Sequence, residues 1–260
     1  RPLKKSLIIC TLFLAGCASI TPPDGGARDE LPPRVIWSYP DSAQTMVSPE
    51  YFFFTFDEYV KTKQIQDLLI ISPTLSSKPR TEIKKKTLFI RFDDTLKSNT
   101  TYSISLSGCI VDNNEGNVLN SHHLAFSTGA VLDSLNYSAF VSEAFSKQAC
   151  AECLLVLYDQ DKDSGALLYR PTYLAQTNAA GYATISNLAE GSYWVQALKD
   201  ENKNLLLNND EMTSLRRKIH LHDSMVTDSF QVFPYAGDTK NSLSFKMIYP
   251  GVGQLVFDRA

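Results

Sequence analysis

The chain has 260 residues, of which 43% are hydrophobic and 20% are charged, and its formal net charge is −3. This length suits two domains of about 100–150 residues, and the hydrophobic content excludes disorder throughout the chain. A nucleic-acid-binding protein usually carries a basic domain, so we expect no nucleic-acid partner. The 5 cysteines are too few for a fold built on disulfides.

The first residues have the pattern of a bacterial export signal. A basic segment with Lys4 and Lys5 precedes an apolar run over residues 6–16, which is too short to span a bilayer as a helix. We therefore predict a signal peptide over residues 1–16. Residues 17–33, which are rich in proline and glycine, are predicted to form a tether without regular structure.

The end of this signal resembles the bacterial lipobox, with the residues Leu14-Ala15-Gly16-Cys17. The resemblance implies that Cys17 is acylated and becomes the first residue of a lipid-anchored protein. Ala18 follows where an Asp would signal retention in the inner membrane, so likeness to Gram-negative lipoproteins implies the outer membrane. The membrane face stays open, and an ordinary signal peptide with a chance cysteine is the alternative.

Residues 34–129 alternate short β-type runs with turn residues, which predicts a β-sandwich. The strongest run is Tyr51–Phe56, where Phe52, Phe54 and Phe56 fall on one face and are expected in the core. The other expected strands are Arg34–Tyr39, Leu68–Ile71, Thr87–Phe92, Thr101–Ser107 and Leu124–Thr128. A short helix is expected near Lys63–Leu68.

The order of motifs in residues 34–129 resembles the bacterial Ig-like domain first noted in surface-layer proteins. The matching motifs are Pro40-Asp41, Phe54–Glu58, Ile71–Pro73, Leu96–Tyr102, Asp112–Asn117 and Phe126–Thr128. The turn at Asp112–Asn117 has one residue more than is usual in the family. The resemblance implies a structural or binding module without catalytic activity.

Residues 130–235 show a second series of strands, expected at Asn136–Phe145, Cys153–Tyr158, Thr172–Thr177, Tyr182–Ile185, Ser192–Lys199 and Met225–Phe233. Gly181 suits a left-handed turn, and Leu188, Tyr193 and Val195 are expected to point into the core. Residues 177–195 resemble the transthyretin-like fold of carboxypeptidase regulatory domains and collagen-adhesin repeat domains. The resemblance implies a sandwich that acts as a spacer, a stalk or a module facing carbohydrate or peptide.

Residues 236–260 contain two further strand patterns, Ser242–Tyr249 and Gln254–Phe257. We interpret them either as the opening of a truncated third unit or as an edge hairpin of the second domain. The predicted fold class is therefore all-β, with two consecutive β-sandwiches, Ig-like and then transthyretin-like, behind a lipoprotein signal peptide.

The sequence contains no catalytic motif of the common hydrolase, protease or phosphate-binding types. His220 and His222 share a strand face and supply at most half a metal site, and solvated strand histidines are the simpler reading. The basic runs Lys84–Lys86 and Arg216–Lys218 are expected to be solvated turns.

Cys150 and Cys153 form a C-x-x-C pattern. In a redox site this pattern opens a helix, but here a strand follows, which favours a structural disulfide in an oxidising envelope. Two free thiols are the alternative. Cys109 is expected to pack as a small hydrophobic residue.

The acidic and amide-rich segment 200–211 has the oxygen spacing of an EF-hand loop. Its predicted Ca²⁺ ligands are Asp200, Asn202, Asn204, the carbonyl of Leu206, Asn208 and Glu211. Leu205 stands where the EF-hand has glycine, and we expect a bulky residue to resist the turn. Only two of the ligands carry charge, so the site is predicted to be weak, with a polar loop that caps its own backbone as the alternative.

These observations lead to one functional hypothesis and one alternative. The first is a non-catalytic outer-membrane lipoprotein that serves as spacer, scaffold or adhesion module, with no certain cofactor. The alternative is a component of an envelope complex that binds a glycan or a protein. Trp37 and Trp194 both fall inside predicted strands, which we take as evidence against glycan binding.

Overall fold

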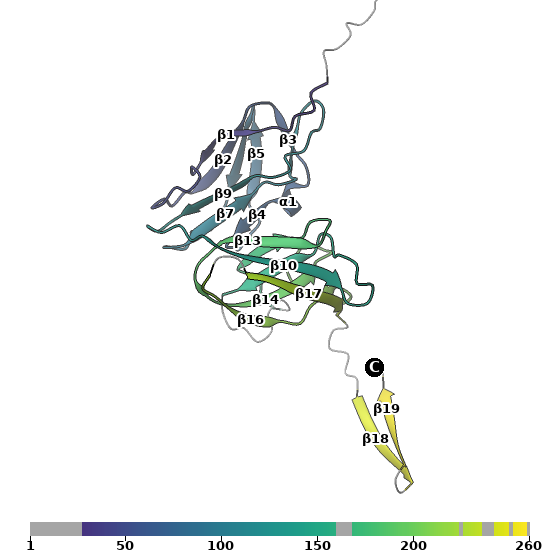
Figure 1. Ribbon diagram of the computed structural model, residues 1–260. Coiled ribbons are helices and arrows are strands. Elements are labelled where there is room, and N and C mark those ends of the chain that lie inside the picture. Colours follow the sequence, from purple (N-terminus) through teal and green to yellow (C-terminus); the bar gives the residue numbers. More distant parts are fainter. Residues whose placement is uncertain (1–27, 160–167, 224–225, 236–241, 250–251, 259–260) are drawn as a thin grey trace, which may run out of the picture. The chain divides into compact units, whose positions relative to one another are not determined.

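The computed structural model describes residues 28–159, 168–223, 226–235, 242–249 and 252–258. The described chain is built from strands with one short helix, α1 (Ile65–Leu68), so the all-β prediction is confirmed (Figure 1). No helix in these residues is long and apolar enough to cross a membrane. The predicted signal peptide and Cys17 lie outside the described residues.

The first sandwich has two main antiparallel sheets. One has the order β1-β2-β6-β5, formed by β1 (Val35–Tyr39), β2 (Tyr51–Phe56), β6 (Thr87–Arg91) and β5 (Arg80–Lys84). The other has the order β4-β7-β9, formed by β4 (Ile70–Ser72), β7 (Thr101–Ser105) and β9 (His123–Ser127). A small two-stranded sheet pairs β3 (Val60–Thr62) with β8 (Ile110–Asp112).

The alternation of β2 determines which side of its sheet faces the core. Phe52, Phe54 and Phe56 are fully buried, whereas Tyr51 is exposed and Phe53 is half-buried. Because successive side chains of a strand point to opposite faces, the sequence pattern already assigned these phenylalanines correctly. The strands β3, β5 and β8 were not predicted, since each is short or carries polar residues on an exposed face.

The predicted strand Leu68–Ile71 needs a correction. Leu68 ends α1, and β4 begins only at Ile70. Gln64 starts this short helix from a left-handed backbone conformation, with φ 45°. A single helical turn before a three-residue strand leaves no periodic pattern from which the boundary could be read.

The turn after β8 is organised by one buried carboxylate. Asp112 Oδ1 accepts hydrogen bonds from the backbone N–H groups of Asn114, Glu115 and Gly116, at 2.7–2.9 Å, and Oδ2 accepts one from Asn117 at 2.9 Å. Gly116 has φ 82° and supplies the left-handed residue. Burial acts to raise the pKa of Asp112, but these four donors outweigh it and lower the pKa. The Asp112 carboxylate thus binds the backbone of this turn, including its extra residue.

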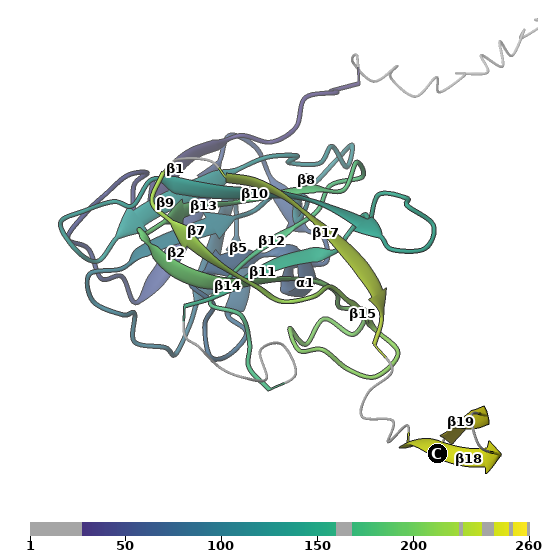
Figure 2. The ribbon, with the colours of Figure 1, turned by 60° about the horizontal axis from the view of Figure 1, so that its bottom comes forward.

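The second sandwich is built from eight strands. They are β10 (Leu135–Glu143), β11 (Leu154–Tyr158), β12 (Tyr173–Gln176), β13 (Tyr182–Leu188), β14 (Gly191–Lys199), β15 (Met212–Thr213), β16 (Arg217–Leu221) and β17 (Val226–Pro234). Their order is β12-β11-β14-β15-β17-β10-β13, with β16 paired to β14. The pair β10 and β17 is parallel, and the two strands run side by side in Figures 1 and 2.

The core of the second sandwich contains the residues that the sequence placed there. Leu188 and Val195 are fully buried, and Tyr193 is 5% exposed. Gly181 has φ 80°, and a Cβ at this position would meet the carbonyl oxygen of Val141 at 2.6 Å. Only glycine therefore fits this turn. The transthyretin-like assignment and the domain boundaries stay predictions.

The basic run Arg216–Lys218 is not a solvated turn as expected, because β16 begins at Arg217 and pairs with β14. The guanidinium of Arg216 lies 4.3 Å from the centre of the Trp194 ring. Arg and Lys stems readily cover apolar surface while their charged groups reach water, so such a run also suits a strand. The run Lys84–Lys86 does contain a turn, with Lys85 at φ 56°.

The strands β18 (Ser242–Tyr249) and β19 (Val252–Asp258) form an antiparallel hairpin (Figure 1). Within the part of the chain that the structure describes, each of them pairs with no other strand. The hairpin register joins Ser242 to Asp258 and Tyr249 to Val252.

Candidate functional site

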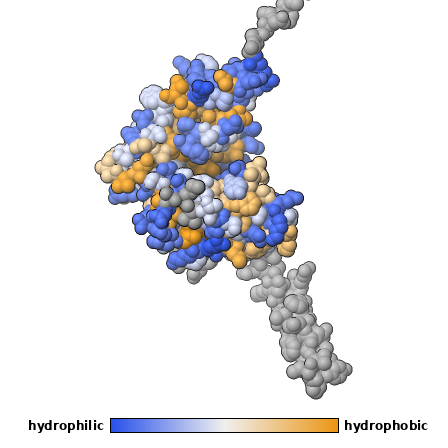
Figure 3. Space-filling view, viewed as in Figure 1, coloured by the Kyte–Doolittle hydropathy of each residue, from blue (hydrophilic) through white to orange (hydrophobic). Residues whose placement is uncertain are grey.

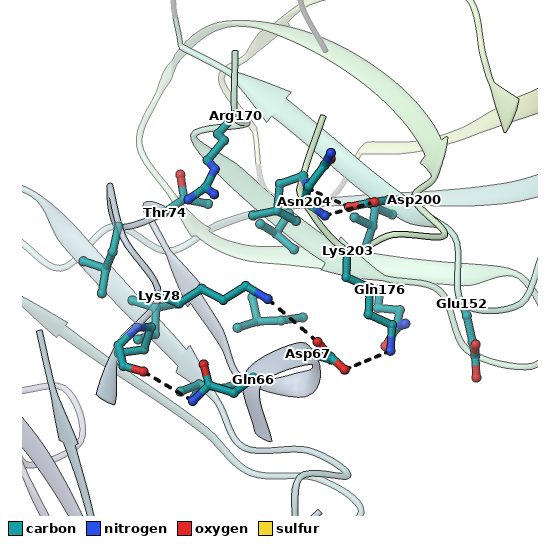
Figure 4. Close-up of a pocket in the computed structure, with 18 of the residues that line it drawn as sticks. Gln66, Asp67, Thr74, Lys78, Glu152, Arg170, Gln176, Asp200, Lys203 and Asn204 are labelled. Carbon is teal, nitrogen blue, oxygen red and sulfur yellow. Dashed lines mark hydrogen bonds and ion pairs between the residues drawn. The ribbon is translucent and has the colours of Figure 1, made fainter. Parts of the chain in front are cut away.

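A pocket of about 380 Å³ opens where α1 and the segment after β4 meet strands β11 and β12 and the loop after β14 (Figure 4). Both sandwiches belong to one compact unit, residues 31–260. The floor of the pocket is apolar and includes Ile70, Leu154, Leu174 and Leu205. A volume of this size lies within the range of small-molecule sites.

Charged side chains surround this floor. Asp67, on α1, lies between two lysines, with Lys203 Nζ 3.2 Å from Oδ2 and Lys78 Nζ 3.8 Å from Oδ1 (Figure 4). Arg170 reaches across and donates from Nη1 to the carbonyl oxygen of Ser76 at 3.2 Å. These ion pairs are partly exposed, so each contributes little to stability, but together they fix the charges around the pocket.

Main-chain hydrogen bonds join the same two regions beside the pocket. The N–H of Thr74 donates to the carbonyl of Thr172 at 2.8 Å, and the Thr74 hydroxyl donates to the carbonyl of Pro171. The N–H of Leu174 donates to the Ser72 hydroxyl at 3.4 Å, and both of these residues are buried. Beside the pocket, Thr74 and Leu174 are therefore held by one backbone–backbone bond and two bonds that involve side-chain hydroxyls.

The lining of the pocket contains no histidine or cysteine. Its carboxylates are Asp67, Glu152, Asp200 and Glu201, of which Asp67 is paired with two lysines. The lining therefore combines apolar side chains with acidic and basic groups in equal number, a composition suited to a ligand that has both an apolar part and polar groups.

Cys150 and Cys153 are placed as a disulfide, with Cα atoms 5.7 Å apart. Both residues are buried at the start of β11, where the Thr177 hydroxyl donates to the carbonyl of Cys150 at 2.7 Å. Whether the purified protein contains this bond stays a prediction. Cys109 is fully buried in the core of the first sandwich, and burial raises the pKa of its thiol to about 12.

The loop after β14 brings the predicted Ca²⁺ ligands into one hydrogen-bonded network. Asp200 accepts bonds from the backbone N–H groups of Asn204 and Leu205, at 3.2 and 2.7 Å. Glu211 accepts bonds from the N–H groups of Glu201 and Asn208, at 3.2 and 2.8 Å.

The remaining predicted ligands belong to the same network. Asn202 and Asn204 cap backbone N–H groups through their side-chain oxygens, and the Asn208 amide donates to the carbonyl of Leu206 at 3.1 Å. This is the self-capping arrangement that the sequence left open as the alternative. Ca²⁺ binding at this loop stays a prediction.

Two features of the loop bear on that prediction. Leu205 adopts the left-handed conformation, with φ 63°, although we expected a bulky residue to resist the turn at this position. Its side chain packs against the apolar cluster below the loop, which compensates for the backbone conformation. Burial raises the pKa of Asp200, and the nearby charge of Glu211 raises it further, against the bonds from the loop N–H groups. The two carboxylates thus converge on one space.

The histidines are not gathered into a metal centre in the described residues, where no group of three or more His, Cys, Asp or Glu side chains could hold an ion. His220 and His222 lie with ring centres 5.9 Å apart at the end of β16, and His222 pairs with Asp223. Burial lowers the pKa of His122 and of His123, and for His122 the neighbouring His123 adds to this effect.

Another titratable cluster lies across β10, β16 and β17. The Tyr137 hydroxyl donates to Asp228, which also accepts from Arg217. Burial acts to raise the pKa of Asp228, but the Arg217 guanidinium outweighs it and lowers the pKa. Burial, followed by the charge of Asp228, raises the pKa of Tyr137. Each group is satisfied within the cluster, which therefore serves the packing of the strands.

Aromatic side chains cover the outer side of the sheet β1-β2-β6-β5. We call Trp37, Tyr39, Tyr51, Phe53 and Phe89 the aromatic face. Trp37 is 62% exposed although it lies in β1, so its position within a strand does not argue against glycan binding as expected. A strand at the surface exposes every second side chain, and the sequence alone did not indicate which side of β1 faced outward.

The comparisons with known proteins identify one region of the chain. Residues 29–128 match the model of a family described as "Bacterial Ig-like domain", which confirms that the chain carries an Ig-like domain. This match covers the first sandwich and its core. No curated protein matches the chain.

Solved structures resemble the chain only distantly. An L,D-transpeptidase from Mycobacterium smegmatis is 13% identical, with TM-score 0.27, over 50% of this chain and 63% of that one. The N-terminal part of the bacterial S-layer protein SbsC is 14% identical, with TM-score 0.28, over 74% and 45%. A pilus 2b backbone protein of group B streptococcus is 13% identical, with TM-score 0.27, over 77% and 96%.

The chain thus covers less than two thirds of the transpeptidase and of the S-layer fragment. TM-scores of this size support no argument about fold or function.

Proposed function

We propose that the protein is a non-catalytic envelope lipoprotein, held to the outer membrane through acylated Cys17, whose sandwiches act as a spacer, scaffold or adhesion module. The observation that carries this proposal is the joint between the sandwiches. Backbone bonds such as Thr74 to Thr172 and the ion pair of Asp67 with Lys203 connect the two regions. A module that presents a surface away from a membrane benefits from domains that are joined in this way, because less orientation is lost on binding.

The titratable groups with shifted pKa values are mainly core tyrosines, a core thiol and carboxylates that cap turns. The Ig-like domain of residues 29–128 fits the same role.

A second candidate function is ligand binding within an outer-membrane complex, with a glycan or a protein as the ligand. The pocket of about 380 Å³ favours it, since an apolar floor under a charged rim is an arrangement suited to a small ligand or a peptide side chain. This alternative is compatible with lipid anchoring and differs from the first in requiring a specific partner.

Membrane fractionation with the intact export signal tests the proposal. The unmodified protein is expected in the membrane fraction with an acylated N-terminus. The Cys17→Ser variant is expected as soluble protein or as an unprocessed precursor, because it has lost the acylated thiol. Cys109→Ser serves as the matched control and should still fractionate with membranes. A processed Cys17→Ser form that stays in the membrane fraction would refute the anchor.

A further inference from the structure

We infer that the aromatic face binds a polysaccharide that carries carboxylate groups. This inference deepens the adhesion role within the proposed function by naming a surface and the chemistry of its partner. It concerns only the first sandwich. The outer face of its sheet β1-β2-β6-β5 belongs neither to the pocket described above nor to the loop after β14.

The register of the sheet gathers the aromatic rings on one side. Tyr39 pairs with Phe53, and Phe53 pairs with Phe89, so their side chains point in the same direction from three neighbouring strands. Trp37 and Tyr51 are 62% and 36% exposed. The opposite side of β2 already carries the buried core phenylalanines, so the aromatic face does not serve the interior of this sandwich.

The rings form a platform rather than a packed cluster. The centres of the Tyr39 and Tyr51 rings lie 6.0 and 6.5 Å from that of Phe53, with planes inclined by only 23° and 27°. Trp37 meets Phe53 edge-on, at 4.8 Å and 77°. Tyr39 and Tyr51 are inclined to each other by 47°, and Phe53 and Phe89 by 48°, so the platform is uneven. The C–H face of a sugar ring can still pack on the exposed faces of these rings as an apolar plate.

Basic groups stand beside these rings. The guanidinium of Arg91 lies 5.6 Å from the centre of the Tyr51 ring and 6.0 Å from that of Phe89. The ammonium group of Lys84 lies 5.9 Å from the centre of the Phe89 ring. An Arg that stacks on an aromatic ring keeps its donors free at the edge, where they can bind a carboxylate through two hydrogen bonds.

This sheet face carries a small excess of basic groups. Arg80 and Lys84 are paired with Asp93 and Glu82, at 2.7 and 3.2 Å, and Arg91 adds a positive charge beside the rings. The formal net charge of the protein is −3. A local excess of positive charge on an acidic protein attracts an anionic partner to that face alone. Figure 3 shows that hydrophilic residues border the apolar ones over the described surface.

The same observations weigh against other occupants. A second copy of the chain would bring the same basic excess to both sides of the interface, which gives no charge complementarity. A nucleic acid requires several phosphate contacts and usually a basic domain. The core of a protein interface is mainly apolar. This sheet instead places the hydroxyl pair Thr55 and Thr87, 3.0 Å apart, next to Trp37, which suits a ligand that alternates C–H faces with hydroxyl groups.

Affinity electrophoresis of the full chain tests the inference. The probes are polygalacturonate, which carries carboxylates, and its fully methyl-esterified form, which has the same sugar rings without charge. The variants are Trp37→Ala and Arg91→Gln, and Phe145→Ala removes an exposed aromatic side chain from the second sandwich as the control. A thermal melt of each variant verifies the fold, which is expected to persist because these side chains are exposed.

Polygalacturonate is expected to retard the unmodified protein, and this effect should weaken as the salt concentration rises. Trp37→Ala should weaken binding about tenfold or more, as truncation of a central aromatic contact does. Arg91→Gln should lower the preference for the charged polymer over its ester, and Phe145→Ala should bind normally.

Several results would overturn the inference: no retardation by polygalacturonate, equal retardation of Trp37→Ala, tighter binding to single-stranded DNA, or a dimer in solution that Trp37→Ala dissociates. None of them affects the fractionation of Cys17→Ser, so failure here is distinguishable from failure of the lipid anchor.

Discussion

The face assignment of β2 can be tested by comparing two adjacent phenylalanines. Phe54 is fully buried in the first core, and its ring meets that of His122 edge-on at 5.7 Å. Phe53, one residue earlier in the strand, is half-buried on the aromatic face. The variants Phe54→Ala and Phe53→Ala remove the same atoms from the two sides of one sheet, so their difference measures the core.

The expected magnitudes follow from burial. Truncation of a fully buried phenylalanine costs about 3–5 kcal/mol of unfolding free energy, because apolar transfer and the cavity left behind both contribute. Phe53→Ala loses three cross-strand ring contacts, to Trp37, Tyr39 and Phe89, worth about 0.2–1 kcal/mol each, so its cost should be about 0.6–3 kcal/mol and lower than that of Phe54→Ala. With a urea dependence of about 1–3 kcal/mol/M, Phe54→Ala should lower the unfolding midpoint by roughly 2 M.

Urea titration can follow the first sandwich separately. The chain has 2 tryptophans, Trp37 in β1 and Trp194 in β14. In a Trp194→Phe background, fluorescence therefore reports the first sandwich, while far-ultraviolet circular dichroism follows all the strands. A cost below about 1 kcal/mol for Phe54→Ala, or equal costs for the two variants, would refute the face assignment.

Three further predictions concern the turns and the thiols. The four N–H donors lower the pKa of Asp112, so its contribution to stability is full above the unfolded pKa of about 3.9 and is lost as the pH falls through the folded pKa. Acid titration should show this loss of stability. The loss should disappear in Asp112→Asn and persist in the exposed control Asp41→Asn. Ca²⁺ at about ten times Kd, with Kd near 10⁻⁴–10⁻³ M, should stabilise the second sandwich by roughly 1.4 kcal/mol. Asp200→Asn should abolish this stabilisation by Ca²⁺, and Glu201→Gln should keep it. An unchanged melting temperature at several millimolar Ca²⁺ would reject the site. Mass spectrometry after thiol alkylation of the unreduced, unfolded protein should find Cys150 and Cys153 unlabelled and Cys109 labelled; labelling of all three would contradict the disulfide.

The core face of β2 and the turn at Gly181 could be predicted, because each has a clear local sequence pattern. The alternation in Tyr51–Phe56 placed three phenylalanines in the core, and the glycine at 181 marked a turn that only glycine fits. The strand Arg217–Leu221 was not found, because its basic residues are typical of a solvated turn and only pairing with β14 shows otherwise. The order of strands and the pairing of β10 with β17 depend on contacts between distant residues, which local patterns do not contain.

The candidate sites divide in the same way. The spacing in the loop after β14 predicted six Ca²⁺ ligands, and the structure brings these residues into one hydrogen-bonded network, while Ca²⁺ binding stays a prediction. The pocket could not be read, because its floor combines Ile70 of one sandwich with Leu154 and Leu174 of the other. The aromatic face was hidden for a different reason. Trp37 and Phe53 were visible in the sequence, but a bulge between Val35 and Trp37 changes the register of β1 and disturbs the simple alternation.

Two loops of this protein use one carboxylate in the same way, and their difference shows where a cation would act. Asp112 and Asp200 each begin a turn and accept backbone N–H groups that follow within five residues. The pKa of Asp112 is lowered, whereas burial and the neighbouring Glu211 raise that of Asp200. At Asp112 the N–H donors lower the pKa by more than burial raises it. At Asp200 they do not outweigh the combined effect of burial and of a second carboxylate. A divalent cation would offset this repulsion only at Asp200, so any stabilisation by Ca²⁺ should appear in the second sandwich and leave the unfolding of the first unchanged.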